Sequence, residues 1–269
     1  MSFLSIFRKS NSVSVIQLNG VISPNMGRRK GLNLQELEKS IEQAFTGSNI
    51  KAVALQINSP GGSPVQSEMI ALRIRELSEK KNIPVLAFVE DVAASGGYWL
   101  ACAADEIFAS KASIIGSIGV VSSGFGFNKA IEKLGIDRRL YTSGDNKAIL
   151  DPFLPENKDD IKKLKNIQKE LHLQFIGFVK SRRGDKIKDE NKEVFTGAFW
   201  SGESSIELGL IDAFGEMKKV LKTRFGEKIK IKEFAPKKKL FGFSSLLSGA
   251  IELFVFKIEE RSIFKRFGL

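Results

Sequence analysis

Residues 91–98 read DVAASGGY and lie between an apolar run and a helix-like run. The preceding residues 84–90 (PVLAFVE) predict a buried strand, and residues 98–104 (YWLACAA) predict a helix. Small residues at a strand-to-helix junction let a serine hydroxyl stand above a sheet, beside backbone N–H groups. Ser95 therefore fits a nucleophile. It also fits a helix N-cap followed by two turn-forming glycines, and these residues alone leave both interpretations open.

The composition narrows the chemistry that Ser95 could use. The chain of 269 residues is 42% hydrophobic and has one histidine and one cysteine. The single cysteine, Cys102, excludes an internal disulfide and a cysteine-based zinc site, and its apolar surroundings favour a core position. A serine nucleophile must use His172 or work without histidine. Sites with two or three imidazole ligands are excluded, so we predict neither a metal nor a cofactor.

The net charge and hydropathy of the chain indicate whether it binds nucleic acid or a membrane. The net charge is +11, and much of it falls in residues 158–192 and 218–239, where lysines alternate with acids as on solvated surfaces. The chain has no recognisable nucleic-acid-binding module, so we expect no nucleic-acid partner, and an anionic membrane surface suits the charge better. Residues 1–9 lack the order of a secretory signal. No run of 18 apolar residues occurs, so we expect no transmembrane helix.

Strand-like and helix-like segments alternate along the chain. The sequence predicts strands at residues 12–18, 50–57, 84–90, 106–109, 136–142 and 228–234, and helices at 33–44, 68–77, 128–134, 157–179 and 215–224. Such alternation predicts βαβ units, and therefore an α/β fold with a mostly parallel sheet flanked by helices. We expect one domain over residues 1–235 and a tail over residues 236–269.

Three features follow predicted strands, where the sites of parallel sheets gather: Gly61–Gly62, Ser95 and Lys147. A lysine has an ordinary pKa of about 10.4 and serves as a base only if burial lowers that pKa by roughly 3–5 units. Gly61 and Gly62 would let a peptide substrate approach the backbone closely and would offer an N–H group to an oxyanion. An ordinary turn after Pro60 is the alternative.

The chain carries several motifs in a fixed order. They are NSPGG at 58–62, ASGGY at 94–98, GSIGV at 116–120, Lys147, TGAFWSGE at 196–203 and ELGLID at 207–212. In this combination the sequence resembles the signal peptide peptidase A family, the S49 or protease IV serine peptidases. The resemblance covers about residues 13–225.

The resemblance implies a ClpP/crotonase-like fold and a serine–lysine dyad. Its positions in this chain are Ser95 as nucleophile, Lys147 as general base, Ser117 as the residue that orients Lys147, and Gly62 and Gly96 as oxyanion donors. A departure is Asp145, whose carboxylate would oppose the lowered pKa if it faced Lys147. In a single-length chain the resemblance also implies a homo-oligomeric ring in which neighbouring protomers share the dyad.

The function implied is that of a serine endopeptidase that cleaves signal-peptide remnants or other hydrophobic peptides through an acyl-enzyme. Two alternatives stay open, a crotonase-like acyl-CoA enzyme and a catalytically silent membrane-associated scaffold. The tail is apolar over residues 240–256 and basic after them, which predicts an amphipathic helix that packs on a neighbouring protomer or on a membrane. Most members of that family have an N-terminal membrane anchor, and we expect none in this sequence. We expect a cytoplasmic protein, with peripheral contact to the inner membrane as the alternative.

Overall fold

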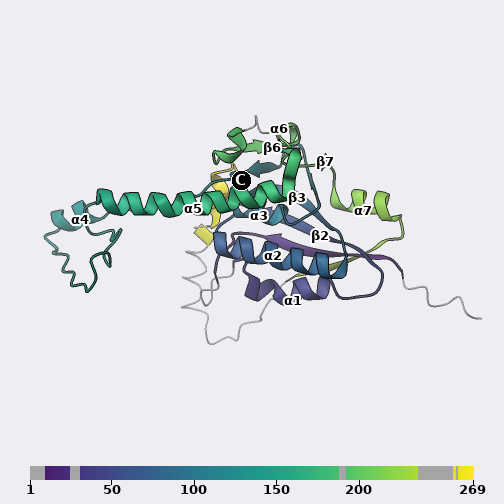
Figure 1. The fold of residues 1–269 in the computed structure, drawn as a ribbon, viewed down its shortest axis with the longest axis horizontal. Helices are drawn as coiled ribbons and strands as arrows, with labels where there is room; N and C mark the ends of the chain where they lie inside the picture. Colours follow the sequence, from purple (N-terminus) through teal and green to yellow (C-terminus); the bar gives the residue numbers. More distant parts are fainter. Residues whose placement is uncertain (1–9, 25–30, 188–191, 236–256, 259) are drawn as a thin grey trace, which may run out of the picture. The chain divides into compact units, whose positions relative to one another are not determined.

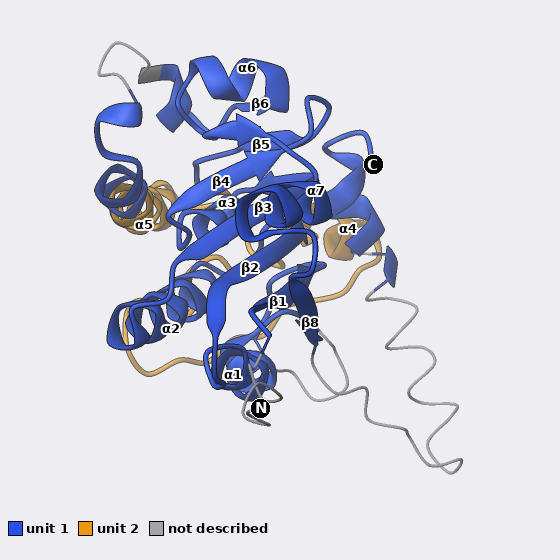
Figure 2. Ribbon diagram, turned by 90° about the vertical axis from the view of Figure 1, so that its right-hand side faces the viewer, with its two compact units in different colours: residues 1–119, 176–269 blue, residues 120–175 orange. Residues whose placement is uncertain are grey.

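A computed structural model describes residues 10–24, 31–187, 192–235, 257–258 and 260–269 (Figure 1). The contacts divide the chain into two compact units (Figure 2). The larger unit comprises residues 1–119 and 176–269, and the smaller unit comprises residues 120–175. The boundary predicted at residue 235 is a different division, and it stays a prediction.

The larger unit is built on one eight-stranded sheet with the order β6-β5-β3-β2-β1-β8, in which β4 pairs with β3 and β7. All pairings are parallel except that of β5 with β6. The strands are β1 (Ser12–Asn19), β2 (Ile50–Ser59), β3 (Val85–Ala94), β4 (Glu106–Ala109), β5 (Ile114–Gly116), β6 (Phe199–Ser201), β7 (Ala213–Phe214) and β8 (Lys230–Phe234). The predicted α/β class with a mostly parallel sheet is confirmed, and the lysine-rich β8 ends the strand order as expected of an edge.

Helices follow most strands, as the alternation in the sequence predicts. They are α1 (Leu34–Ala44), α2 (Pro64–Lys81), α3 (Gly96–Ala101), α4 (Asn128–Lys133), α5 (Lys158–Arg183), α6 (Gly202–Glu207) and α7 (Met217–Phe225), with short 3₁₀ turns at Gly184–Lys186 and Lys192–Phe195. Asn33 caps α1, because its side-chain oxygen accepts the N–H of Glu36 at 3.0 Å. The long helix predicted from residue 157 is α5, which crosses the boundary between the two units.

Alternate residues of each strand point to opposite faces of the sheet, so both faces carry side chains. Helices cover both faces. Val13 and Val15 of β1 and Phe88 of β3 pack with Leu221 of α7 on one face. Helices α1 and α2 cover the opposite face, and α2 buries apolar residues such as Ile70 there (Figure 2). Burying one such side chain contributes roughly 1.5–3 kcal/mol. Two covered faces explain why the central strands are nearly continuous apolar runs.

The smaller unit contains α4, a series of turns and the first part of α5. The strand predicted at residues 136–142 is wrong, because this segment has no regular secondary structure. Apolar side chains remain at the surface of this unit: Phe125 is 83% exposed, Leu134 is 73% exposed and Tyr141 is 91% exposed. An extended segment becomes a strand only when a neighbour satisfies its backbone groups, and no described strand pairs with these residues.

The described end of the C-terminal tail contacts other parts of the larger unit, to which it belongs. Residues 257–258 and 260–265 are helical, while the apolar residues 240–256 lie outside the described part. The ring of Phe267 meets that of Phe199 edge-on, with centroids 5.2 Å apart. A cavity of about 670 Å³ lies between tail residues such as Phe264 and the strand ends at Asn19 and Asn58. Among the described residues no helix has the length and hydropathy needed to cross a membrane.

Candidate active site

Ser95 is the turn between β3 and α3. Strand β3 ends at Ala94 and α3 begins at Gly96, so Ser95 occupies the N-cap position. Its side chain makes no capping hydrogen bond, and it is half-buried. The cap interpretation is therefore right about the position, while the hydroxyl remains available for another partner.

The backbone of Ser95 is strained. Its φ of 53° and ψ of −123° lie in a region that residues with a side chain rarely adopt. Such a conformation costs about 1–3 kcal/mol and persists only where the surroundings impose it. The Ser95 N–H donates to the carbonyl of Gly116 on β5 at 2.8 Å, which holds one side of the turn. This is the geometry of a serine raised above the carboxyl edge of a sheet.

The glycine loop after β2 lies against this turn. A Cβ atom on Gly61 would approach the Cβ of Ser95 to 2.8 Å and the nitrogen of Gly96 to 2.7 Å. Gly61 and Gly62 have φ values of 98° and 143°, so the loop also needs glycine for its backbone conformation. The predicted closeness of the 61–62 loop to Ser95 is thus present in the structure.

Two backbone N–H groups are left open beside the serine. The nitrogen of Gly62 lies 3.3 Å from the place that a Cβ on Gly96 would take, so the two residues are neighbours. Within the part of the chain that the structure describes, the N–H groups of Gly62 and Gly96 donate to no acceptor. Unpaired N–H groups beside a hydroxyl can hold an oxygen that becomes negatively charged.

Ser117 lies next to Ser95 across the sheet. Strands β3 and β5 are parallel, and their register pairs Ala94 with Gly116, which brings the following residues side by side. Ser117 also has a positive φ, 52°, and its N–H donates to the carbonyl of Ala198 at 2.6 Å. The ends of two adjacent strands therefore place Ser95 and Ser117 side by side at one edge of the sheet.

Lys147 belongs to the smaller unit, whereas Ser95, Ser117 and the three glycines belong to the larger one. It is exposed in the single chain and lies in a turn, where its N–H donates to the carbonyl of Gly144 at 3.1 Å, and the strand predicted before it does not form. The neighbouring Asn146 binds Lys163. The pairing of Lys147 with Ser95 stays a prediction.

Several residues around the site were not singled out from the sequence. Ser67 of α2 is buried, and its hydroxyl would lie 2.4 Å from a Cβ on Gly96. A Cβ on Gly116 would likewise lie 2.9 Å from the ring of Trp200. The hydroxyl of Tyr98 donates to the carbonyl of Leu210 at 2.8 Å. Tyr98 and Trp200 lie inside the quoted motifs, but the sequence does not show which residues they contact.

The single cysteine is not part of the site. The Cys102 thiol is buried, and burial raises its pKa to about 12. This agrees with the predicted core position and with an unreactive thiol.

The single histidine, His172, lies within α5 in the smaller unit. No cluster of three or more histidine, cysteine or acidic side chains suited to a metal occurs among the described residues.

Comparison with known proteins identifies the family and the fold of this chain. The profile of Peptidase family S49 matches residues 78–229, and the chain belongs to this family. A putative signal peptide peptidase SppA from Enterococcus faecium is 32% identical over 206 residues, which are 74% of this chain and 59% of that protein. The family suggested by the sequence motifs is thereby confirmed.

Another relative has a different name. A Na(+)/H(+) antiporter NhaA of Brucella abortus (strain 2308) is 43% identical over 272 residues, or 96% of this chain and 37% of that protein. The match covers little more than a third of that protein. Most of the polypeptide to which the name refers therefore has no counterpart in this chain. This chain thus spans between about a third and three fifths of these two relatives.

A solved structure confirms the fold. It is a lysine-to-alanine mutant of the 1510-N membrane-bound stomatin-specific protease in complex with a substrate peptide. The TM-score is 0.52 at 16% sequence identity, and the match covers 90% of this chain and 98% of that chain. At this identity the likeness concerns the fold alone.

Proposed function

We propose that this chain is a serine endopeptidase with a Ser95–Lys147 dyad that acts through an acyl-enzyme. The observation that carries the proposal is the strained Ser95, whose hydroxyl caps nothing and lies beside the open N–H groups of Gly62 and Gly96. Membership of Peptidase family S49 supports a peptide bond as the target. With one histidine in the chain, lysine is the available base of the known serine variants.

The reaction follows from these groups. The Ser95 oxygen attacks the carbonyl carbon of the substrate, and its proton passes to the neutral amine of Lys147. The carbonyl oxygen becomes an oxyanion that the N–H groups of Gly62 and Gly96 stabilise. Lys147 then gives the proton to the leaving amine as the C–N bond breaks, which leaves an ester on Ser95. Water hydrolyses the ester with Lys147 again as base, and Ser117 orients the amine.

The proposed base needs a drier environment than the single chain provides. Lys147 is exposed in the single chain, and a lysine serves as a base near neutral pH only when desolvation lowers its pKa. The smaller unit also exposes large apolar side chains, among them Phe125 and Tyr141. Such surfaces commonly mark protein contacts. A ring in which a second copy covers this unit, and in which neighbours share the dyad, would bury both.

For the substrate we propose signal-peptide remnants or other hydrophobic peptides, as the similarity to a putative signal peptide peptidase suggests. For the location we propose the cytoplasm, with the basic tail residues such as Arg261 and Lys265 at the inner membrane as the alternative. Cosedimentation of the full chain with anionic vesicles separates the two locations, because the tail alternative requires binding that salt weakens.

Cleavage of a quenched fluorescent hydrophobic peptide by the purified full chain tests the proposal. Ser95→Ala and Lys147→Ala should each lower kcat at least about a thousandfold while the circular dichroism spectrum stays unchanged. Lys147→Arg keeps the positive charge, but a guanidinium does not lose its proton and cannot act as a base, so this variant should be equally inactive. Lys158→Ala, which removes an exposed lysine of the same unit, is the matched control and should keep full activity.

A mixture of the two inactive variants tests the shared dyad. If one copy supplies the serine and its neighbour supplies the lysine, random mixing of Ser95→Ala with Lys147→Ala restores about a quarter of the sites. Full activity of Lys147→Ala would refute the dyad. Turnover of acyl-CoA without peptide cleavage would favour a crotonase-like enzyme, and a folded oligomer that cleaves neither would favour a scaffold.

A further inference from the structure

The segment that presents Ser95 is closed at its far end. Strand β3 leads from Val85 to Ser95, and α3 leads back from Ser95 toward Asp105. There, the N–H of Val85 donates to the Asp105 carboxylate at 2.9 Å, and the N–H of Asp105 donates to the Val85 carbonyl at 2.8 Å. Residues 85–105 thus form a loop with the strained turn at one end and Asp105 at the other.

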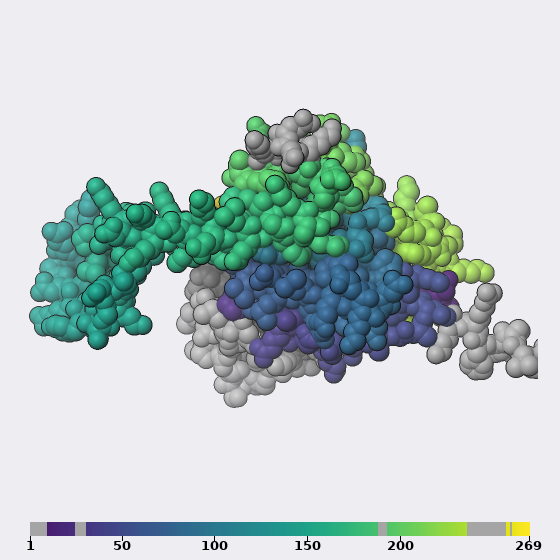
Figure 3. Space-filling model, in the orientation of Figure 1, coloured from purple at the N-terminus to yellow at the C-terminus, as the bar shows by residue number. Residues whose placement is uncertain are grey.

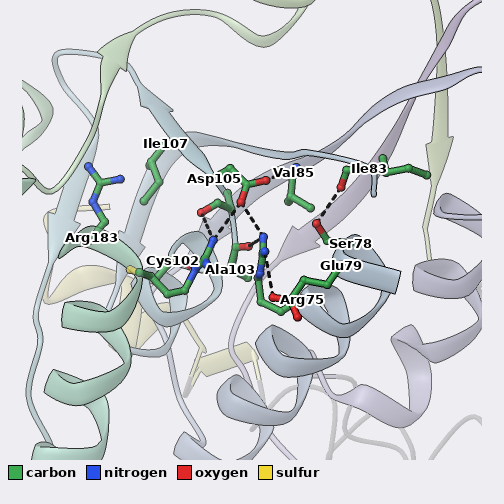
Figure 4. A network of polar contacts seen from close by, with 12 residues as sticks. Arg75, Ser78, Glu79, Ile83, Val85, Cys102, Ala103, Asp105, Ile107 and Arg183 are labelled. Carbon is green, nitrogen blue, oxygen red and sulfur yellow. Dashed lines mark hydrogen bonds and ion pairs between the residues drawn. The ribbon is translucent and has the colours of Figure 1, made fainter. Parts of the chain in front are cut away.

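Two arginines from other helices bind the closed end, and Figure 4 labels one of them, Arg75, beside Asp105. Arg75 of α2 donates to one carboxylate oxygen of Asp105 at 2.8 Å, and Arg182 of α5 donates to the same oxygen at 3.1 Å. We call Arg75, Val85, Asp105 and Arg182 the Asp105 cluster. On the face in Figure 3, the side chains of α2 and of the end of α5 adjoin each other, as these shared contacts require.

The same arginines bind the backbone that follows α3. Arg182 donates from Nε to the carbonyl of Cys102 at 3.0 Å and from Nη2 to that of Ala104 at 3.2 Å. Arg75 donates to the carbonyl of Ala103, between them, at 3.3 Å. Three consecutive carbonyls after α3 are therefore fixed by side chains that also bind Asp105. A planar guanidinium can hold two directions at once, which a single ammonium cannot.

This arrangement explains what imposes the strain at Ser95. A residue with unfavourable φ and ψ relaxes unless the elements on both sides of it are held. Beyond the site itself, the Asp105 cluster holds the start of β3 and the backbone after α3, so the turn between them cannot open by shifting either element. The ion pairs are partly exposed, and such pairs contribute only about 0–1 kcal/mol to stability. Their effect should therefore fall on the geometry of Ser95 rather than on the fold.

We propose that Arg182 and Asp105 are positioning residues for Ser95, holding the two ends of residues 85–105 so that the serine keeps its reactive backbone conformation. This rests on the proposed function, in which Ser95 is the nucleophile. Misplacing a reacting atom by about 1 Å can cost about a hundredfold in rate. The loss should appear in the attack by Ser95 and leave the binding of substrate nearly unchanged.

The test compares Arg182→Gln, Arg182→Lys and Asp105→Asn with the wild-type full chain. The rate of labelling by a fluorophosphonate, and kcat and KM for the fluorescent peptide, should be measured together with the thermal midpoint. Arg224→Gln is the control, because Arg224 makes a comparable surface pair with Glu106 at 2.6 and 2.7 Å, in which the arginine is 38% exposed against 22% for Arg182, and it binds neither Val85 nor Asp105.

Arg182→Gln and Asp105→Asn should lower the labelling rate and kcat about tenfold to a hundredfold, with KM within about twofold. Arg182→Lys should recover part of the loss, and the thermal midpoints should match that of the control. Labelling within about twofold of wild type in both Arg182→Gln and Asp105→Asn would overturn the proposal, as would losses that match those of the control. A wild-type chain that shows no label on Ser95 would instead refute the proposed function, and this inference with it.

Discussion

Removing one partner of the buried ion pair between Arg183 and Asp212 should strongly destabilise the fold. The Arg183 side chain is 2% exposed and that of Asp212 is 17% exposed, with nitrogen and oxygen 2.7 Å apart. Arg183 also donates twice to the carbonyl of Gly209, and Asp212 accepts the N–H of Ile107 at 2.7 Å. Asp212→Asn leaves a buried guanidinium without its counterion, which should cost about 3–5 kcal/mol. For a chain of this size the thermal midpoint should fall by roughly 6–20 °C.

Thermal unfolding followed by circular dichroism measures this loss. Glu203→Gln is the control, because its pair with Lys111 is about two-thirds exposed on both sides and should contribute less than about 1 kcal/mol. If Asp212→Asn lowers stability by no more than the control, Arg183 does not depend on this carboxylate, and the interpretation of the pair is wrong.

The pH dependence gives an independent check on the same pair. Burial raises the pKa of Asp212, but hydrogen bonds from Arg183, Lys186 and the Ile107 N–H outweigh it, so the pKa lies below its ordinary value. A carboxyl with a lowered pKa stabilises the folded state above its unfolded pKa of about 3.9 and loses that contribution as the pH falls through the folded value. The wild type should lose stability over that acid range, and Asp212→Asn should lack this part of the loss.

Two further predictions concern close packing and the buried thiol. In Gly97→Ala the new Cβ would lie 2.2 Å from the Ser59 carbonyl oxygen, so we expect the free energy of unfolding, measured by chemical denaturation, to fall by about 1–3 kcal/mol. Gly177 lies on α5 with open space around it, so Gly177→Ala should raise the free energy of unfolding by about 0.5–1 kcal/mol. Equal stability of the two variants would contradict the packing described beside Ser95. With its pKa at about 12, Cys102 should not react with a disulfide reagent at pH 8 in the folded protein and should react once after unfolding, and rapid reaction of the folded chain would contradict its burial.

Much of the larger unit could be predicted from local patterns. Continuous apolar strands, each followed by a polar or glycine-rich end, indicated a parallel sheet and placed Ser95 and Gly61 at the same edge. The structure confirms the fold and brings these two residues into contact. Ser117 lies beside Ser95 because the register of β3 and β5 is fixed by buried side chains on both strands.

Other features depend on contacts that a sequence pattern does not contain. The sequence predicts a strand at residues 136–142, but these residues have no described neighbour with which to pair. Arg182 and Arg183 look like the basic end of a solvated helix, yet one binds Asp105 and the other is buried against Asp212. Lys147 is exposed on the smaller unit, and its pairing with Ser95 stays a prediction.

The central claim, that Ser95 is the nucleophile, can be tested by labelling the full chain with a fluorophosphonate and mapping the adduct by mass spectrometry. We predict one adduct, on Ser95, at a rate that Lys147→Ala lowers strongly and with no label at all in Ser95→Ala. An adduct on another residue, or undiminished labelling of Ser95→Ala, would contradict the account.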